Sequence, residues 1–176
     1  MSGHNKWSQI KHKKAASDAK KSALFGKLAR QIALESKKAG GDMKSPPLRA
    51  AIDKAKSYNM PGDNIDRAVK KGAQGDASNM EEVLYEAYGP GGCAILIEGL
   101  TDNKNRTTQE VKHIFSKNNL ALAGQGAALW NFEKTADGWK AKTTVKLSQG
   151  DETSLETLLT ELDDHDDVQE VYTSAE

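Results

Sequence analysis

The first 75 residues carry apolar positions at helical spacing in three successive segments. In the longest, residues 17–39, Leu24, Leu28 and Ile32 recur every four positions. This spacing places them on one face of an amphipathic helix. The pair Gly40-Gly41 directly after the segment is a typical helix stop, because glycine adopts the left-handed conformation that ends many helices.

Two shorter helices are predicted after the first. One begins at Ser45-Pro46, a capping residue followed by proline in the first turn. The other follows Met60-Pro61 and ends near Gly72. Three amphipathic helices joined by short connections predict a small helical bundle over residues 15–75, preceded by an arm over residues 1–14.

After a linker rich in small and polar residues, the periodicity changes to that of strands. Residues 83–88 alternate between apolar and polar, and residues 93–100 are almost continuously apolar, which predicts a central strand. The remaining predicted elements are a helix over 107–117, a strand over 127–132, a strand over 139–147 that follows the Asp137-Gly138 hairpin turn, a helix carrying Leu155 to Leu162, and a closing strand over 168–172. This order contains a βαββαβ unit with one extra hairpin strand and predicts a ferredoxin-like domain over residues 76–176. The expected fold class is therefore α+β.

Charge is divided unequally between these two regions, although the whole chain is neutral. Residues 1–75 contain 17 basic and 6 acidic residues, a net charge of +11, and residues 76–176 contain 8 and 19, a net charge of −11. A basic half of this kind predicts a polyanionic partner, most commonly the phosphate backbone of a nucleic acid. The alternative is a solvated basic surface that binds nothing.

The candidate phosphate contacts lie on the long helix and the arm. At 100° per residue, Lys20, Lys27 and Lys38 fall opposite the apolar row, and Arg30 flanks them. The arm contributes further candidates, which are Lys6, Trp7, Lys11, His12, Lys13 and Lys14. Its Trp7 either stacks on an unpaired base or docks the arm on the bundle, and the sequence leaves both open.

A second candidate contact is the polar segment TDNKNRT, residues 101–107, between the central strand and the next helix. Capping that helix needs only one of its polar residues, such as Asp102 or Asn103. Lys104, Asn105 and Arg106 are then surplus donors, suited to phosphate or base edges near a helix N-terminus. A loop that only connects two elements is the alternative.

The sequence predicts no enzyme. It lacks the nucleophile-elbow, metalloprotease, phosphate-loop and dinucleotide-binding motifs. The glycines of residues 89–92 indicate a hairpin turn, since they join two strands rather than a strand and a helix. The acidic run of residues 163–167 lacks the ligand spacing and the glycine of a metal loop, so we expect a solvated loop. The single Cys93 allows neither an internal disulfide nor a cysteine-built metal site.

No metal, cofactor or small-molecule substrate is expected. The longest apolar run is the length of a strand, too short to cross a bilayer, and the first residues lack the apolar core of a secretory signal. We therefore expect a cytoplasmic protein without a membrane partner.

Four segments in order along the chain resemble the YebC family, which includes the mitochondrial translational activator of cytochrome c oxidase subunit I. They are GHNKWSQIKHKKAASDAKK, NMPGDNIDRAVKKG, YEAYGPGGCAILIEGLTDNKNRT and VQEVYTSAE. The resemblance implies a helical N-terminal domain followed by α+β material. Typical members carry a further small domain inserted in the α+β part. Here the chain continues directly through the Asp137-Gly138 hairpin, so we expect that insert to be absent.

The resemblance implies one of two roles, DNA-binding transcriptional regulation or ribosome-associated help with difficult stretches such as consecutive prolines. Lysine dominates the basic half, which suits neutralising a phosphate backbone better than reading bases. No helix presents the arginine, asparagine and glutamine pattern of a major-groove reader. The sequence thus favours an RNA- and ribosome-binding factor, with a DNA-binding regulator as the alternative and a self-associating adaptor as a third possibility. It leaves the oligomeric state and the sequence specificity open.

Overall fold

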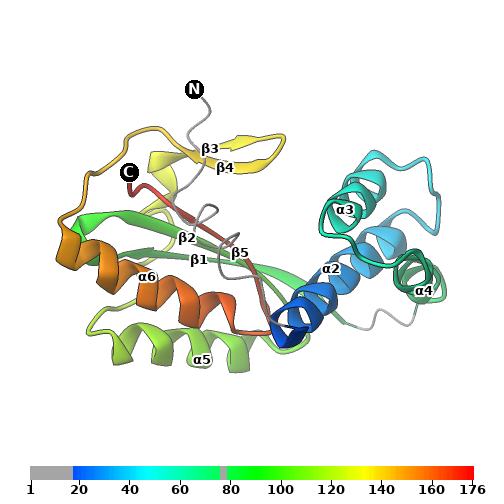
Figure 1. Ribbon diagram of the computed structural model, residues 1–176, viewed down its shortest axis with the longest axis horizontal. Coiled ribbons are helices and arrows are strands. Elements are labelled where there is room, and N and C mark those ends of the chain that lie inside the picture. Colours follow the sequence, from blue (N-terminus) through cyan, green and yellow to red (C-terminus); the bar gives the residue numbers. More distant parts are fainter. Residues whose placement is uncertain (1–17, 76–78) are drawn as a thin grey trace. The chain divides into compact units, whose positions relative to one another are not determined.

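The computed structural model describes residues 18–75 and 79–176, which fall into two compact units. One unit is Ala16–Glu81, and the other contains Glu82–Glu176. Figure 1 shows helices alone in the first and a sheet with helices in the second. In the described part of the chain, no helix combines the length and the apolar character needed to cross a membrane.

The three predicted helices of the first unit are present. They are α2 (Asp18–Lys38), α3 (Pro46–Ser57) and α4 (Gly62–Ala73). Helix α2 stops where the glycine pair was expected to end it. Gly40 and Gly41 have φ angles of 59° and 82°, and the Gly41 N–H donates to the Ser36 carbonyl at 2.9 Å, closing the helix end.

Helices α2 and α4 pack closely because Gly72 has no side chain. A Cβ atom at position 72 would lie 2.2 Å from the Ala33 carbonyl oxygen and 2.7 Å from the Ser36 Cβ. The Ser36 hydroxyl also donates to the Val69 carbonyl at 2.7 Å. The core of the bundle consists of small and branched apolar side chains, namely Leu28, Ile32, Leu48, Ala51, Ile52, Ala55, Met60, Ile65 and Ala68.

The second unit is built on a three-stranded sheet with the order β1-β2-β5. Its strands are β1 (Glu81–Tyr88), β2 (Ala94–Thr101) and β5 (Val168–Thr173). The nearly continuous apolar strand β2 is the central one, as its sequence predicts. Between β1 and β2 the chain makes the predicted glycine-rich turn, in which the Gly89 N–H donates to the Cys93 carbonyl at 2.8 Å.

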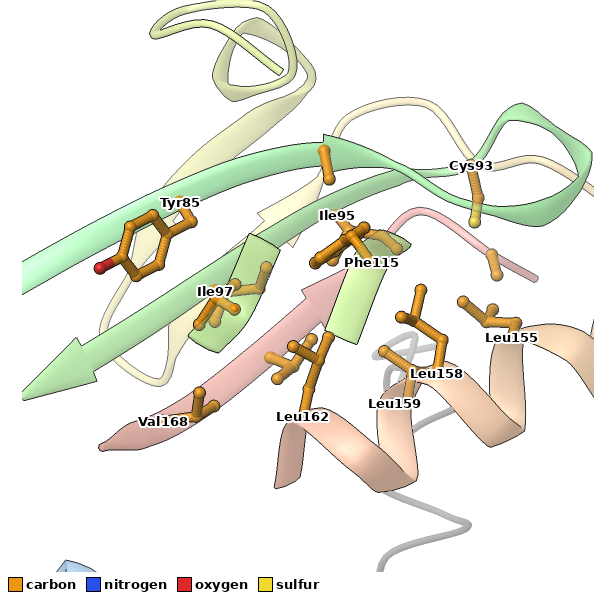
Figure 2. Close-up of a cluster of buried hydrophobic side chains, with 14 of the residues drawn as sticks. Tyr85, Cys93, Ile95, Ile97, Phe115, Leu155, Leu158, Leu159, Leu162 and Val168 are labelled. Atoms are coloured by element: carbon orange, nitrogen blue, oxygen red, sulfur yellow. The ribbon is translucent and has the colours of Figure 1, made fainter. Parts of the chain in front are cut away.

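Helices α5 (Lys104–Lys117) and α6 (Gln149–Asp163) cover one face of this sheet. Figure 2 shows the four leucines of α6 pointing toward the strands, where Ile95 and Ile97 of β2 meet them. Val111 and Phe115 of α5 complete this core and are fully buried. The leucine spacing of residues 155–162 therefore predicts the buried face of α6 correctly.

A two-stranded ribbon covers the opposite face of the sheet. It consists of β3 (Phe132–Thr135) and β4 (Gly138–Ala141), joined by the predicted Asp137-Gly138 turn. Phe132 packs against Ala94 and Leu96 of β2. The ribbon is also tied to β2 through Glu98, which accepts hydrogen bonds from Lys134 and Trp139 of the ribbon. Glu98 also accepts one from Tyr172 of β5.

The α+β class and the helical N-terminal unit are confirmed, but the ribbon differs from expectation in extent and pairing. Its strands pair with each other and not with β2, because β1 and β5 occupy both sides of β2. The expected strand over 127–132 begins only at Phe132, because the preceding backbone turns to bind Glu86. The strand expected over 139–147 ends at Ala141, because Asn131 then holds the backbone of Thr143 at 2.9 and 3.0 Å.

Candidate nucleic-acid interface

The expected cationic row on α2 is only partly exposed. Lys20, Arg30 and Lys38 are exposed as expected, but Lys27 is only 8% exposed, so its place on an exposed cationic face is wrong. The same side of the helix carries the buried Glu35, whose carboxylate accepts from Gln31 and pairs with Lys38 at 3.2 Å. A carboxylate therefore lies among the cations on this side of α2, where only basic residues were expected to carry charge.

Exposed cations instead cover all three helices of the unit. Residues 18–75 contain 13 basic residues, of which 12 are exposed, and 6 acidic residues. Those on α3 and α4 are Arg49, Lys54, Lys56, Arg67, Lys70 and Lys71. Several stand in the last turns of their helices, where positive charge also complements the helix dipole. The basic character of the unit therefore appears as a broad surface rather than one stripe.

The arm candidates Lys6, Trp7, Lys11, His12, Lys13 and Lys14 lie outside the described residues. They remain predictions from the sequence.

The polar segment before α5 divides into capping, exposed and paired residues. Asn103 is the N-cap, and its side chain accepts the Arg106 N–H at 3.1 Å. Lys104 and Asn105 are exposed in the first turn, as expected. Arg106 is not a surplus donor, because its guanidinium donates to Asp167 at 2.8 Å and to Asp102 at 2.9 Å. Those two hydrogen bonds raise the pKa of Arg106 above its usual value.

Asp167 overturns the expectation that residues 163–167 form a solvated loop. It is buried, and besides Arg106 its carboxylate accepts from the Thr107 hydroxyl at 2.7 Å. Its backbone carbonyl accepts the Leu100 N–H at 2.8 Å. The start of α5 is thus fastened to the chain entering β5, and an acidic residue at the end of the run is part of the fold.

Glu110, His165 and Asp167 bring potential metal-ligand atoms within 4.8 Å of one another. Hydrogen bonds already engage these atoms: His165 Nε2 lies 2.8 Å from the Glu110 carboxylate, and His165 Nδ1 accepts the Asp167 N–H at 3.1 Å. The Arg106 guanidinium also donates to the Asp167 carboxylate. The arrangement supports a structural junction between α5 and β5.

A buried carboxylate that sequence reasoning missed is Glu86 of β1. Its oxygens accept the backbone N–H groups of Gly126 at 2.6 Å, Ala128 at 2.8 Å and Leu129 at 2.8 Å. Burial acts to raise the pKa of Glu86, but these three hydrogen bonds outweigh it and the pKa is lowered. The glycine-containing stretch AGQG, residues 123–126, indicates a turn, but nothing in the sequence indicates that Glu86, 40 positions earlier, binds it.

Trp130, immediately after that turn, is the second residue missed. It is 61% exposed, and its ring N–H donates to the Ala127 carbonyl at 2.9 Å and to the Tyr88 hydroxyl at 3.1 Å. The expected strand over 127–132 gave it no separate role.

Family models match most of the chain. The model of the TACO1/YebC protein N-terminal domain matches residues 5–75, and the model of the TACO1/YebC second and third domain matches residues 80–137. The second match ends at the β3–β4 turn, where the sequence suggested that an inserted domain is missing.

Relatives from several bacteria carry the name "Probable transcriptional regulatory protein". The one from Desulfosudis oleivorans is 48% identical over 179 residues, covering 100% of this chain and 72% of its own length. The one from Trichlorobacter lovleyi is 47% identical over 175 residues, covering 98% of this chain and 70% of its own. The one from Petrotoga mobilis is 53% identical over 136 residues, covering 76% of this chain and 54% of its own length.

A solved structure shares the fold. The crystal structure of a conserved hypothetical protein from Aquifex aeolicus superposes with a TM-score of 0.84 at 32% identity, covering 97% of this chain and 96% of that one. With the two family models and the bacterial relatives, this likeness shows that the chain belongs to the TACO1/YebC family.

Proposed function

We propose that the protein is a non-enzymatic regulator of gene expression that binds RNA and associates with the ribosome. The observation that carries this proposal is the exposed positive charge of the helical unit, with 12 exposed cations among residues 18–75. Such a surface attracts a phosphate backbone by releasing its condensed counterions. The proposal extends to the arm of residues 1–14, which adds four lysines.

The make-up of the surface supports backbone binding rather than reading of bases. Ten of the 13 basic residues in 18–75 are lysines, which act as point charges on phosphate, whereas base recognition favours the planar fork of arginine. Of the three arginines there, Arg67 donates to Asn64 and to the Asp63 carbonyl of its own helix. Structured RNA, recognised largely through shape and phosphates, fits this surface.

The second candidate function is DNA-binding transcriptional regulation. The names of the bacterial relatives favour it, and the same cationic surface would bind duplex DNA. The two candidates differ in whether duplex DNA competes with the ribosome for the protein.

The test is sedimentation of the protein with ribosomes at low and near-physiological salt, with excess duplex DNA as competitor. One variant replaces Lys6, Lys11, Lys13 and Lys14 with glutamate, and a second carries Lys71→Glu on α4. Lys112→Glu, an exposed lysine on a helix of the acidic unit, is the charge-matched control.

Co-sedimentation that survives salt and DNA, fails in the arm variant, weakens in Lys71→Glu and persists in the control supports the proposal. Co-sedimentation that DNA abolishes would move DNA binding to first place. Co-sedimentation equal in all variants would refute the cationic surface as the contact.

A further inference from the structure

The acidic unit presents one large aromatic side chain to solvent. Trp130 is 61% exposed, more than the other exposed large apolar side chains of the described residues, which are Met43, Leu84 and Tyr88. Tryptophan is normally among the most deeply covered residues, because its large ring gains most from leaving water. Because single exposed apolar side chains are common on protein surfaces, the case for a partner depends on how this ring is held and on what lies around it.

Hydrogen bonds hold the ring in one orientation. The indole N–H lies against the Ala127 carbonyl and the Tyr88 hydroxyl, and Tyr88 in turn donates to the same carbonyl at 2.6 Å. The polar edge of the indole is therefore satisfied within the protein, and its apolar surface is what remains for a partner. A side chain fixed in this way loses little conformational entropy on binding.

The backbone beneath the ring is fixed from both sides. Before Trp130, the Glu86 carboxylate accepts the backbone N–H groups of Gly126, Ala128 and Leu129. After it, the buried Asn131 pairs with the backbone of Thr143 through both its amide oxygen and its amide nitrogen. Trp130 is thus mounted on a rigid loop.

A cation contacts the backbone of Trp130 in a unit that is otherwise acidic. The Lys142 ammonium donates to the Trp130 carbonyl at 3.0 Å and is exposed. Residues 134–146 contain four lysines and a single acidic residue, Asp137. Lys134 is paired with Glu98 at 3.0 Å and lies over the Trp139 ring, and the other three, Lys140, Lys142 and Lys146, are exposed. Half of the eight basic residues of the C-terminal region therefore fall within thirteen positions.

An exposed aromatic ring whose backbone is contacted by an exposed lysine matches the chemistry of an unpaired nucleotide. The base stacks on the ring and the phosphate meets the ammonium groups, an arrangement common in single-strand binders. A protein partner would also cover an aromatic ring, but interfaces between proteins are depleted in lysine. The cluster of lysines favours nucleic acid.

We propose that Trp130, with Lys142 beside it, forms a stacking site for an unpaired base of an RNA strand. This inference rests on the proposed RNA-binding function and adds a contact from the acidic unit, separate from the cationic helices.

The test is the affinity of the full chain for a labelled RNA of about 12 nucleotides, a length typical of such sites, measured by fluorescence anisotropy. The same sequence is measured as a single strand, as a duplex and as single-stranded DNA. Trp130→Ala removes the ring, Trp130→Phe keeps an aromatic face, and Met43→Ala, which removes an exposed apolar side chain of the helical unit, is the control. Urea unfolding of each variant checks that it is folded.

We expect Trp130→Ala to lose roughly ten-fold or more in affinity for the single strand, in line with the stacking of one base. Duplex affinity should change less than two-fold, Trp130→Phe should retain most of the binding, and Met43→Ala all of it. Binding should also quench the tryptophan emission of the wild type, with a smaller change in Trp130→Phe. A single-stranded DNA affinity equal to that for RNA supports the site and shows that it does not select the sugar.

Several results would overturn the stacking site. Equal single-strand affinity of wild type and Trp130→Ala would do so while leaving the proposed function intact. So would an equal loss on single strand and duplex, or a variant whose only change is weaker self-association. If the wild type binds neither RNA form, the proposed function itself fails.

Discussion

Replacing Glu86 with glutamine tests how the exposed tryptophan loop is built. The carboxylate accepts one N–H on Oε1, from Gly126, and two on Oε2, from Ala128 and Leu129. A glutamine amide has only one acceptor oxygen. Its best placement puts the amide oxygen where it accepts from Ala128 and Leu129, and this points the NH₂ group at the Gly126 N–H. One bond is lost, the other two lose their charge, and a partly buried donor is left without an acceptor.

The expected cost at neutral pH is about 2–4 kcal/mol. A hydrogen bond to a charged group contributes about 1.5–3 kcal/mol, and an unsatisfied buried donor costs about 1–3 kcal/mol. Contributions within one network are not additive, so the sum is an upper limit. A loss of this size is a large fraction of the stability of a typical domain.

The cost should depend on pH in a defined direction. The pKa of Glu86 in the folded protein lies below its ordinary value of 4.5. A lowered folded pKa gives stability that is fully present above the unfolded pKa and is lost as the pH falls through the folded pKa. The glutamine variant has no such group, so the difference between wild type and variant should shrink below about pH 4.5.

Urea unfolding followed by tryptophan emission measures this difference. Trp130 and Trp139 both lie in the unit that holds Glu86, and a Trp7→Phe background removes the remaining tryptophan. Glu133→Gln, an exposed carboxylate on β3, is the control and should change stability by less than about 0.5 kcal/mol. A cost for Glu86→Gln below that level, or one that is the same at pH 7 and pH 3, would refute the role assigned to the carboxylate.

Three further predictions concern the packing, the α5–β5 junction and the cap of α5. Gly72→Ala should destabilise the helical unit by about 2 kcal/mol or more, because its Cβ would lie 2.2 Å from the Ala33 carbonyl oxygen. Gly26→Ala, which has open space around it, should stabilise α2 by about 0.5–1 kcal/mol. Thermal unfolding followed by circular dichroism compares the two variants, and equal unfolding midpoints would contradict the close packing at Gly72. Asp167→Asn should cost about 2–4 kcal/mol in urea unfolding, since a buried acceptor loses its charge beside a guanidinium, and a cost under about 0.5 kcal/mol would show that the junction is not structural. Asn103→Ala should lower the free energy of unfolding by about 1 kcal/mol, because the cap of α5 is lost. Asn103→Asp should stay close to wild type, since aspartate also caps a helix; equal losses of stability in both variants would argue against capping.

The helices and the central strand could be predicted because their signals are local. The spacing of the leucines indicates the buried face of α6, and the continuous apolar run indicates that β2 is buried on both faces. The glycine pair ends α2 whatever the helix packs against. Lys27 and Glu35 could not be placed in this way. Their burial depends on what covers each side of α2, which the spacing of residues along one helix does not contain.

In the candidate site, too, the local features could be predicted from the sequence and the long-range contacts could not. Asn103 and the exposed Lys104 follow from the chain around them, since a cap and a first turn are local features. The pairing of Arg106 with Asp167 joins residues 61 positions apart, and Glu86 reaches residues 40 to 43 positions away. Such contacts appear only once the sheet and its crossing segments are in place, so sequence reasoning assigned Arg106 to a ligand and missed Glu86.

These long-range pairings change what the charge asymmetry means. Carboxylates of the acidic unit serve as internal acceptors: Glu86 binds a loop, Asp167 binds Arg106, and Glu98 gathers Lys134, Trp139 and Tyr172. A carboxylate that accepts from an N–H or O–H group keeps its charge, and one that pairs with a cation occupies that cation as well. The net charge of −11 for residues 76–176 already includes the paired cations Arg106 and Lys134, so it describes the whole region and not the surface around one residue. At Trp130 the cation in reach is Lys142, which is exposed and donates to the Trp130 carbonyl, and this local charge is why a second nucleic-acid contact is physically reasonable on the half of the chain whose net charge argues against one.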